Sequence, residues 1–237
     1  MPELPRGPEL ERPGRQATDD IYGPELGTLP SPDMDDAEIT KTGTTTVGMT
    51  TTDGVVLATD RRASAGNLVA SKRAKKIAEI HPRGALTISG AVSAAQALIS
   101  NLQAEVDLYE ARRGEEMSMQ ALSTLTSNFL RSGAFFIVHP ILGGVDDEGS
   151  HIYSIDPAGS VMEEEYDATG SGSPFAYGVL EQQYEDGLSN DEARTVAARA
   201  VKSAVERDTA SGNGIIMSEI TEDGVDIEEY DDIEQLL

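Results

Sequence analysis

The sequence predicts an α+β fold in which two β-sheets each carry a pair of helices on the outside. Three observations indicate this class. Segments with strand character fall into three groups, two pairs of helical segments separate the groups, and strands do not alternate singly with helices as they do in βαβ units. The chain has 237 residues, which is enough for one large domain with a substantial core.

The first 43 residues differ in composition from the rest. Seven of the eleven prolines lie within residues 1–32, and no apolar periodicity runs through this stretch. Proline blocks regular hydrogen-bonded structure, and the stretch has few residues that could form a core. We therefore expect residues 1–43 to be a disordered leader, either a mobile tail or a removable propeptide, and residues 44–237 to form the folded domain.

The first group of strands begins where the leader ends. Residues 44–51 are β-branched, and Asp53-Gly54 then provides a typical two-residue hairpin turn before a return strand at 55–59. A second strand pair is expected at 77–80 and 85–89. A helix from Val92 to Arg113 follows, because its apolar residues recur every three or four positions: Ala95, Leu98, Ile99, Leu102, Val106 and Tyr109.

Helices and strands continue through the second half of the chain. After a second helix at about 117–130, strands are expected at 135–142, at 151–155 and around 165–168. The next helix spans about 174–186, and the last begins after Ser189 and runs to about Arg207. Ser189 and Glu192 have the spacing of a capping box, which marks a helix start. The final strands are expected at 215–220 and 225–230.

Composition excludes several classes of protein. The net charge of −24 disfavours binding to nucleic acid or anionic lipid. Cysteine is absent and the three histidines lie far apart, so we expect no disulfide, no metal and no cofactor. No apolar run approaches the roughly 18–20 residues of a membrane helix, and no secretory signal is present. We expect a soluble, cytoplasmic protein.

The acid excess has two interpretations. Residues 218–237 carry nine acids and no base, which would suit an acidic tail that binds a basic partner. The excess also extends along the whole chain, and only five basic residues are lysines. Adaptation to high salt, where carboxylates keep a protein hydrated and ions screen their repulsion, explains that wider pattern better.

The leader boundary indicates a possible chemistry. If the bond between Gly43 and Thr44 is cut, Thr44 gains a free α-amine beside its own hydroxyl. An amine with an ordinary pKa near 8 can take the proton of that hydroxyl and make it a nucleophile. Threonine is common at the start of strands, however, so the boundary alone does not establish a hydrolase.

A set of motifs identifies the chain as resembling the β subunits of the 20S proteasome, of the archaeal single-type kind. The motifs occur in the family's order and near its spacing, and the match covers essentially all of residues 44–237. They are Thr42-Gly43-Thr44-Thr45-Thr46-Val47-Gly48, Asp60-Arg61-Arg62, Lys75-Lys76-Ile77, Ser89-Gly90-Ala91, Thr169-Gly170-Ser171-Gly172-Ser173-Pro174 and Arg207-Asp208-Thr209-Ala210-Ser211-Gly212.

The resemblance implies an N-terminal nucleophile hydrolase fold, a four-layer αββα sandwich, and a threonine endopeptidase. Thr44 would be the nucleophile after self-cleavage at Gly43. Lys76 would lower the pKa of the hydroxyl, and Asp60 would hold Lys76 in place. The Gly90 N–H would stabilise the oxyanion. A hydrogen-bond network around the amine would come from Ser171, Asp208 and Ser211.

The resemblance also implies specificity and partners. The pocket beside the cut would have no charged group and would favour large apolar residues; its lining would be Ala63, Ala74, Ala78, Ile88 and Val92. Stacked seven-membered rings of α and β subunits would enclose unfolded substrates supplied by a proteasome-activating ATPase. Two alternatives stay open: a non-catalytic ring subunit, and another N-terminal nucleophile amidohydrolase.

Overall fold

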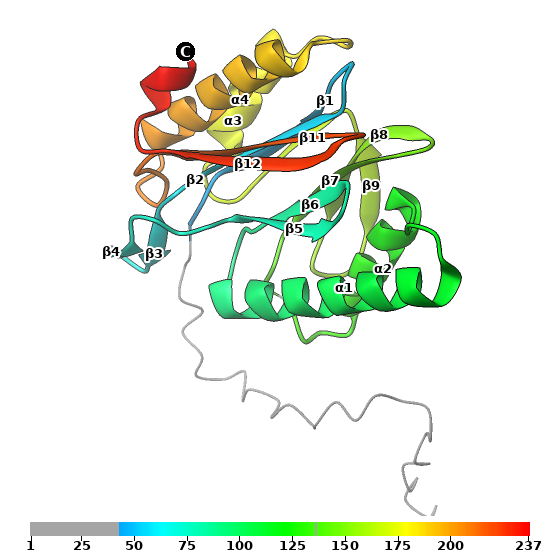
Figure 1. Cartoon of the computed structure of the whole chain (residues 1–237). Helices are drawn as coiled ribbons and strands as arrows, with labels where there is room; N and C mark the ends of the chain where they lie inside the picture. The colour runs from blue at the N-terminus through cyan, green and yellow to red at the C-terminus, as the bar shows by residue number, and fades with distance from the viewer. Residues whose placement is uncertain (1–42, 136) are drawn as a thin grey trace, which may run out of the picture. The chain divides into compact units, whose positions relative to one another are not determined.

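Two five-stranded antiparallel sheets lie face to face in the computed structural model, which describes residues 43–135 and 137–237 (Figure 1). The first sheet has the order β10-β1-β2-β11-β12, and the second has the order β5-β6-β7-β8-β9. The first consists of β1 (Thr46–Thr50), β2 (Val55–Asp60), β10 (Tyr166–Thr169), β11 (Ile215–Thr221) and β12 (Gly224–Tyr230). The second consists of β5 (Ile77–His81), β6 (Gly84–Thr87), β7 (Ile141–Asp146), β8 (Gly149–Ile155) and β9 (Val161–Glu164).

Helix pairs cover the two outer faces of this sandwich. Helices α1 (Val92–Arg113) and α2 (Met119–Arg131) pack on the second sheet, and α3 (Ser173–Gln183) and α4 (Asn190–Val205) pack on the first (Figure 1). The four-layer αββα sandwich is therefore confirmed. The leader expected at residues 1–43 lies outside the described residues except for Gly43, so its disorder stays a prediction.

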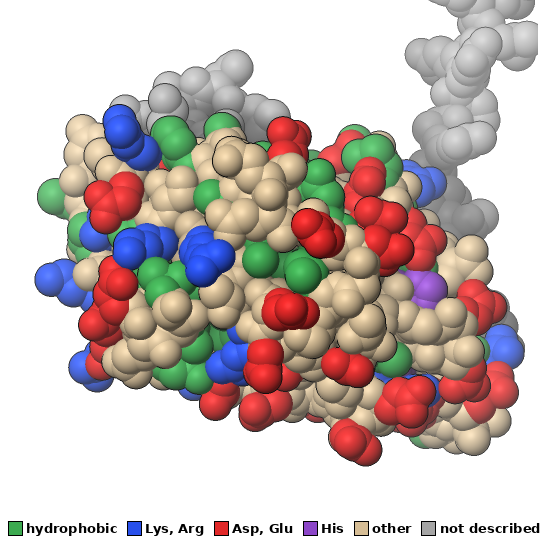
Figure 2. Space-filling view, turned by 90° about the horizontal axis from the view of Figure 1, so that it is seen from above, with side chains coloured by type: hydrophobic (Ala, Val, Ile, Leu, Met, Phe, Trp, Pro, Cys, Tyr) green, Lys and Arg blue, Asp and Glu red, His purple; other side chains and the backbone are tan. Residues whose placement is uncertain are grey.

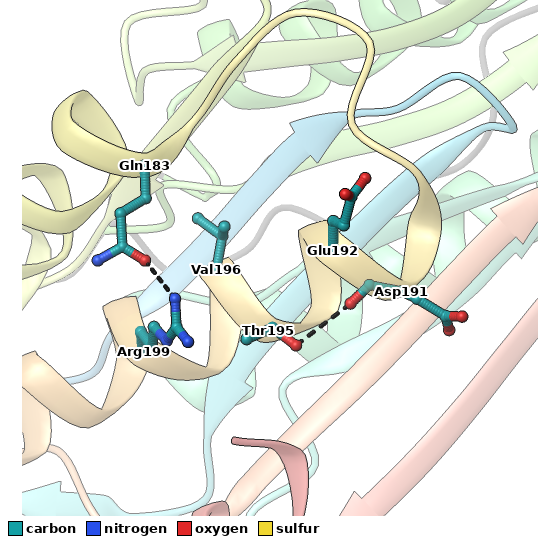
Figure 3. Close-up of a pocket in the computed structure, with 6 residues that line it drawn as sticks. All are labelled: Gln183, Asp191, Glu192, Thr195, Val196 and Arg199. Carbon is teal, nitrogen blue, oxygen red and sulfur yellow. Dashed lines mark hydrogen bonds between the residues drawn. The ribbon is translucent and has the colours of Figure 1, made fainter.

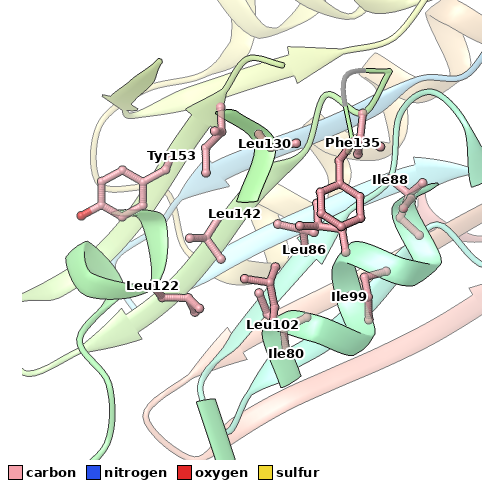
Figure 4. Close-up of a cluster of buried hydrophobic side chains, with 14 of the residues drawn as sticks. Ile80, Leu86, Ile88, Ile99, Leu102, Leu122, Leu130, Phe135, Leu142 and Tyr153 are labelled. Carbon is pink, nitrogen blue, oxygen red and sulfur yellow. The ribbon is translucent and has the colours of Figure 1, made fainter. Parts of the chain in front are cut away.

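Four layers require three apolar interfaces, and the buried side chains form three clusters. One fills the space between the second sheet and α1 and α2, and Figure 4 shows part of it, including Leu86, Leu102 and Leu142. Another lies between the first sheet and α3 and α4, where five buried alanines of α4 allow close helix–sheet packing. The third, around Leu57 and Ile152, lies between the two sheets.

Local sequence signals account for most element boundaries. The Ser189–Glu192 capping box is present at the start of α4, with both reciprocal hydrogen bonds formed. Ser118 caps α2, so this helix begins at Met119 and not at the expected residue 117. Gly114 ends α1 with a φ of 72°, in the left-handed region that glycine tolerates.

Three strands of the structure, β3, β4 and β9, were not predicted from the sequence. A small hairpin, β3 (Ala63–Ala65) and β4 (Leu68–Ser71), follows β2; its residues are mostly exposed or half-buried, so it lacks strand-like alternation. The strand expected around 165–168 is β10 (Tyr166–Thr169), and the strand before it, β9 (Val161–Glu164), was not predicted. β9 pairs within the second sheet and β10 within the first, and the chain passes between the sheets at Glu165.

The strand expected at 135–142 starts only at Ile141. Pro140 has no N–H for a ladder hydrogen bond, and Val138 makes only an isolated bridge with Gly90. The segment before β7 is therefore a connection that places its backbone beside Gly90. A short 3-10 turn at Ile233–Leu236, absent from the sequence reading, follows β12.

The acidic C-terminal stretch is part of the sheet and not a free tail. Gly224–Tyr230 pairs along its whole length with β11. Arg194 of α4 bonds to Glu219 and Glu228, which fixes two of these acids against the domain. Figure 2 shows acidic side chains spread over the face seen from above, whereas basic ones gather toward one end. This distribution agrees with the salt interpretation of the charge.

Candidate active site

Strand pairing brings the ends of four segments together around Thr44. Thr46 of β1 lies opposite Thr59 on one side and Thr169 on the other, and Asp60 lies opposite Ile215. Residues just beyond these pairs therefore converge at one end of the first sheet. Thr44 itself is 3% exposed, and a peptide bond joins it to Gly43.

Asp60 is the centre of the hydrogen-bond arrangement. Its Oδ1 accepts hydrogen bonds from the Thr44 hydroxyl at 2.9 Å, the Thr45 amide at 3.0 Å and Lys76 Nζ at 2.6 Å. Its Oδ2 accepts from the amides of Arg62 and Gly212, both at 2.9 Å. The carboxylate is fully buried, so these five donors replace the water that a charged group would otherwise need.

Lys76 lies between Asp60 and the hydroxyl of Thr44. Its Nζ contacts Thr44 Oγ1 as well as Asp60 Oδ1. Burial lowers the pKa of Lys76, and the neighbouring Asp60 carboxylate opposes that effect only in part. The Thr44 hydroxyl thus donates to a carboxylate and accepts from an amine whose pKa is displaced toward neutrality.

The three remaining catalytic candidates form a second network on the other side of Thr44. Ser171 Oγ accepts from the Thr44 nitrogen at 3.2 Å and donates to Asp208 Oδ2 at 2.6 Å. Ser211 also donates to Asp208 Oδ2, at 2.7 Å. The Thr45 and Ser211 hydroxyls lie 2.7 Å apart, so Thr45 joins the network. All six candidates from the sequence therefore lie in one connected cluster.

Gly90 has a backbone conformation that only glycine adopts readily. Its φ is +110°, and a Cβ at this position would lie 1.8 Å from the Ile137 carbonyl oxygen. The flanking bonds run from Ala91 N to Ile137 O and from His139 N to Ser89 O. These two bonds lie on either side of Gly90. The Gly90–Val138 bridge therefore does not use the Gly90 N–H, and an N–H in this position suits an oxyanion donor.

Gly43 and Gly170 are also required by close contacts. A Cβ on Gly43 would lie 1.9 Å from the Cβ of Ala210 and 2.7 Å from Ser171 Oγ. Gly170 has a φ of +91°, and a Cβ there would lie 2.2 Å from the Thr44 carbonyl oxygen. The backbone on both sides of Thr44 is thus held by contacts that a larger residue would disrupt.

A cavity of about 400 Å³ opens beside Thr44 and Gly90. Four of the five pocket residues expected from the sequence line it: Ala63, Ala74, Ile88 and Val92. The fifth, Ala78, does not; its side chain packs against the cluster under α1.

The expectation that this cavity has no charged group is wrong. Arg62, Lys75 and Lys76 contribute to its wall, as does the polar side chain of Gln96. Arg62 bonds to Asn213 and to the Thr209 carbonyl. Lys75 pairs with Glu229 at 3.1 Å. Each base therefore already has a partner within the subunit, and the uncommitted part of the wall is mostly apolar.

Another hollow, of about 590 Å³, lies over α3 and α4 and does not touch this cluster (Figure 3). Arg199 and Gln183 bond across it at 2.9 Å. It contains none of the candidate residues, so we do not assign the chemistry to it. Within the described residues, no group of three or more His, Asp or Glu could hold a metal ion. No described helix combines the length and hydropathy of a membrane span.

Some contributors to the site were not assigned from the sequence. The amides of Thr45, Arg62 and Gly212 bind Asp60, and the Ser64 hydroxyl bonds to the Ala210 carbonyl. All lie in or beside motifs that were recognised. Their role depends on backbone N–H direction, however, which no residue type reveals.

Comparison with known proteins gives one consistent result. A family model described as proteasome subunit matches residues 40–220. A protein of Haloquadratum walsbyi named proteasome subunit beta is 66% identical over 223 residues, covering 92% of this chain and 91% of that protein. The protein of the same name from Haloferax volcanii is 65% identical, covering 91% and 90%. That of Natrialba magadii is 57% identical, covering 97% of each. The acidic composition of the chain agrees with the haloarchaeal origin of these relatives.

Proposed function

The chain belongs to the proteasome subunit family as a β subunit of the haloarchaeal kind, and we propose that it is an active threonine endopeptidase that frees its own nucleophile. One observation carries this proposal: the hydroxyl of Thr44 contacts both Lys76 and Asp60, directly after Gly43. A subunit with only a structural role has no need for a buried lysine–carboxylate pair directed at that hydroxyl.

Self-cleavage is the first step of the proposal. In the uncut chain the Thr44 nitrogen belongs to an amide and cannot accept a proton. Lys76 is the neighbouring group suited to that task, because burial lowers its pKa and its Nζ contacts Thr44 Oγ1. The oxygen attacks the carbonyl carbon of Gly43, the bond to nitrogen breaks, and the nitrogen takes a proton. Water then hydrolyses the resulting ester and leaves Thr44 with a free amine.

Cleavage of other chains follows the same chemistry with a different base. The new α-amine takes the hydroxyl proton, and Ser171, bonded to Asp208, fixes the position of that amine. The oxygen attacks a substrate carbonyl, and the N–H of Gly90 binds the oxyanion. The amine returns the proton to the leaving nitrogen, and water releases the acyl group from Thr44.

Specificity and partners are further parts of the proposal. The alanines, Ile88 and Val92 around the cavity favour a large apolar side chain before the cut, since the nearby bases are paired within the subunit. The family name supports membership of the proteasome core with other subunits. Heptameric α and β rings, ATPase-supplied unfolded substrates and a cytoplasmic location stay predictions from the sequence.

Intact mass and activity together test the proposal. The chain co-produced with its ring partners should give a mature protein beginning at Thr44, and this protein should cleave a fluorogenic peptide with an apolar residue before the cut. Thr44→Ser is the informative variant, since it keeps a hydroxyl and should retain both processing and some turnover. A mature chain that lacks peptidase activity would leave the non-catalytic ring subunit as the better interpretation.

A further inference from the structure

An acidic hollow lies between the open edges of the two sheets. Its volume is about 780 Å³, and β9 and β10 contribute most of its wall. Glu163, Glu164, Glu165 and Asp167 line it, together with serine, threonine and tyrosine hydroxyls. Among the residues that the structure describes, no lysine, arginine or histidine contributes to the wall. The polar part of the wall therefore consists of oxygen atoms with an excess of negative charge, and Met162 adds an apolar part.

A hollow of the same size elsewhere on the domain provides a contrast. It lies between the β1–β2, β7–β8 and β11–β12 turns and is lined by six acids, among them Asp147 and Asp223. Arg83 is part of its wall, however, and lies 3.8 Å from Asp147. His151 pairs with Glu163 at 2.6 Å at the rim of the first hollow, so that glutamate is partly neutralised. No lysine, arginine or histidine of the described residues pairs with Asp167.

Asp167 sets the hollow between the sheets apart further. Its side chain is 4% exposed, and its Oδ1 accepts a hydrogen bond from the Tyr177 hydroxyl. Its Oδ2 is buried and has no partner among residues 43–135 and 137–237. Burial and the adjacent Asp167 raise the pKa of Tyr177 to about 12, so this tyrosine stays a neutral donor. It satisfies one carboxylate oxygen and leaves the negative charge unbalanced.

Strand alternation directs this carboxylate into the hollow. Asp167 lies on the same face of β10 as Thr169, whose hydroxyl bonds to the His139 carbonyl in the segment before β7. Ser150 and Ser154 lie on the same face of β8 as Ile152, which packs between the sheets. The carboxylate of Asp167 and these serine hydroxyls therefore face one another across the gap.

A buried carboxylate without a counter-charge is costly, so the site needs a cation. The donors are hard oxygen atoms, which suit alkali and alkaline-earth ions. No three carboxylates in the described residues converge as a tight divalent site requires. We propose that this hollow binds one alkali-metal cation, with Asp167 Oδ2 as the anionic ligand and the hydroxyl wall as its neutral surroundings. The ion bridges the edges of the two sheets and stabilises the folded subunit.

A specific site is distinguishable from general screening by the identity of the cation. Screening depends on ionic strength alone, whereas a coordinated ion must be small enough to enter the hollow and shed water. We would measure the melting temperature of the full-length chain in sodium, potassium and tetramethylammonium chloride at equal molarity. Sodium or potassium should raise it above the tetramethylammonium value by about 3–6 °C at ten times the dissociation constant.

Two variants assign that difference to the hollow. Asp167→Asn removes the charge but keeps an oxygen that accepts from Tyr177, and it should abolish the difference between cations. Asp223→Asn removes one charge from the hollow that contains Arg83, and it should retain the difference. An equal loss in both variants, or none in Asp167→Asn, would overturn the proposal.

Rubidium provides the direct test, because it resembles potassium and scatters anomalously. Crystals grown in rubidium chloride should show an anomalous peak at Asp167 Oδ2, and crystals of Asp167→Asn should lack it. A lysine or arginine of a neighbouring subunit at that position, with no peak, would show that a protein side chain supplies the charge and would refute the ion site.

Discussion

Replacing Asp60 by asparagine tests whether the site depends on one buried carboxylate. Asparagine has nearly the same shape but presents one oxygen and one NH2 group. With its oxygen toward Lys76 and Thr45, its NH2 faces the amides of Arg62 and Gly212, which are donors themselves. Rotating the side chain by 180° moves the same conflict to Lys76 and Thr45. No orientation satisfies every neighbour.

The expected cost follows from these bonds. Two buried donors lose their acceptor, at about 1–3 kcal/mol each. Removing one partner of a buried ion pair costs about 3–5 kcal/mol, and the two figures describe overlapping losses. We therefore expect Asp60→Asn to lower the free energy of unfolding by about 3–5 kcal/mol. The melting temperature should fall by roughly 6–20 °C.

Urea unfolding at constant molar salt provides the measurement. Wild-type and variant chains would both carry Thr44→Ala, so that neither loses its leader. Asp208→Asn is the matched control. The asparagine oxygen can keep the bond from the Ala210 amide, and the Ser171 and Ser211 hydroxyls on the other side can rotate to suit an NH2 group. That control should cost only about 0.5–1.5 kcal/mol.

A small effect of Asp60→Asn would refute this reasoning. If it lowered stability no more than Asp208→Asn does, the four bonds to the carboxylate that remain in the Thr44→Ala background would not be important for the fold. Processing by Asp60→Asn in a chain with an intact Thr44, at the wild-type rate, would equally contradict the proposed positioning of Lys76.

Four further results are expected. Thr44→Ala should abolish peptidase activity and leave the leader uncut while rings still assemble, as mass spectrometry and size-exclusion chromatography would show; residual turnover would contradict the nucleophile. Lys76→Ala should lose processing and activity but keep its circular dichroism spectrum, because Asp60 retains four donors; wild-type turnover would refute the proton-transfer role. At about 0.1 M salt the Debye length is about 10 Å, so acids on neighbouring subunits repel one another and rings should dissociate on dilution into low salt before the subunits unfold. Size-exclusion chromatography across a salt series checks this, and intact, active particles at low salt would count against it. Burial lowers the pKa of His151, but Glu163 and Asp146 outweigh burial, so the pKa is raised. The stability that His151 adds should be fully present below about pH 6.5 and should be lost as the pH rises through the raised pKa. The urea midpoints of wild type and His151→Gln should therefore converge at alkaline pH, and a constant gap would refute this linkage.

Much of the fold was predictable because periodicity and turn chemistry agree. The α1 bounds were predicted fully, and the Ser189 capping box marked α4 correctly. The reading failed where tertiary contacts decide. No local signal at Glu165 reveals that residues on either side of it join different sheets. The β3–β4 hairpin is short and largely exposed, so it lacks the alternation that a half-buried strand shows.

The candidate site was predictable only through the family resemblance. Thr44, Asp60 and Lys76 are ordinary residue types at separations that suggest nothing by themselves, and antiparallel pairing of β1, β2 and β10 brings their surroundings together. The error at Ala78 has a similar origin: a list of positions does not say on which side of β5 a small side chain lies. The paired bases around the cavity depend on Glu229 and Asn213, which are far away in sequence.

If Thr44 is the nucleophile that we propose, the five bonds to Asp60 also have a consequence for the timing of its reaction during synthesis. Their donors come from the start of β1, the end of β2, the approach to β5 and the turn before β11. The last of these, Gly212, lies 152 residues after Asp60 in the sequence. On the proposed mechanism, a nascent chain that has not reached Gly212 lacks one of the five bonds, so its Thr44 is not yet positioned to react. The same mechanism implies that a chain truncated before Gly212 would keep its leader, so that leader removal would follow folding of the turn before β11 against β2.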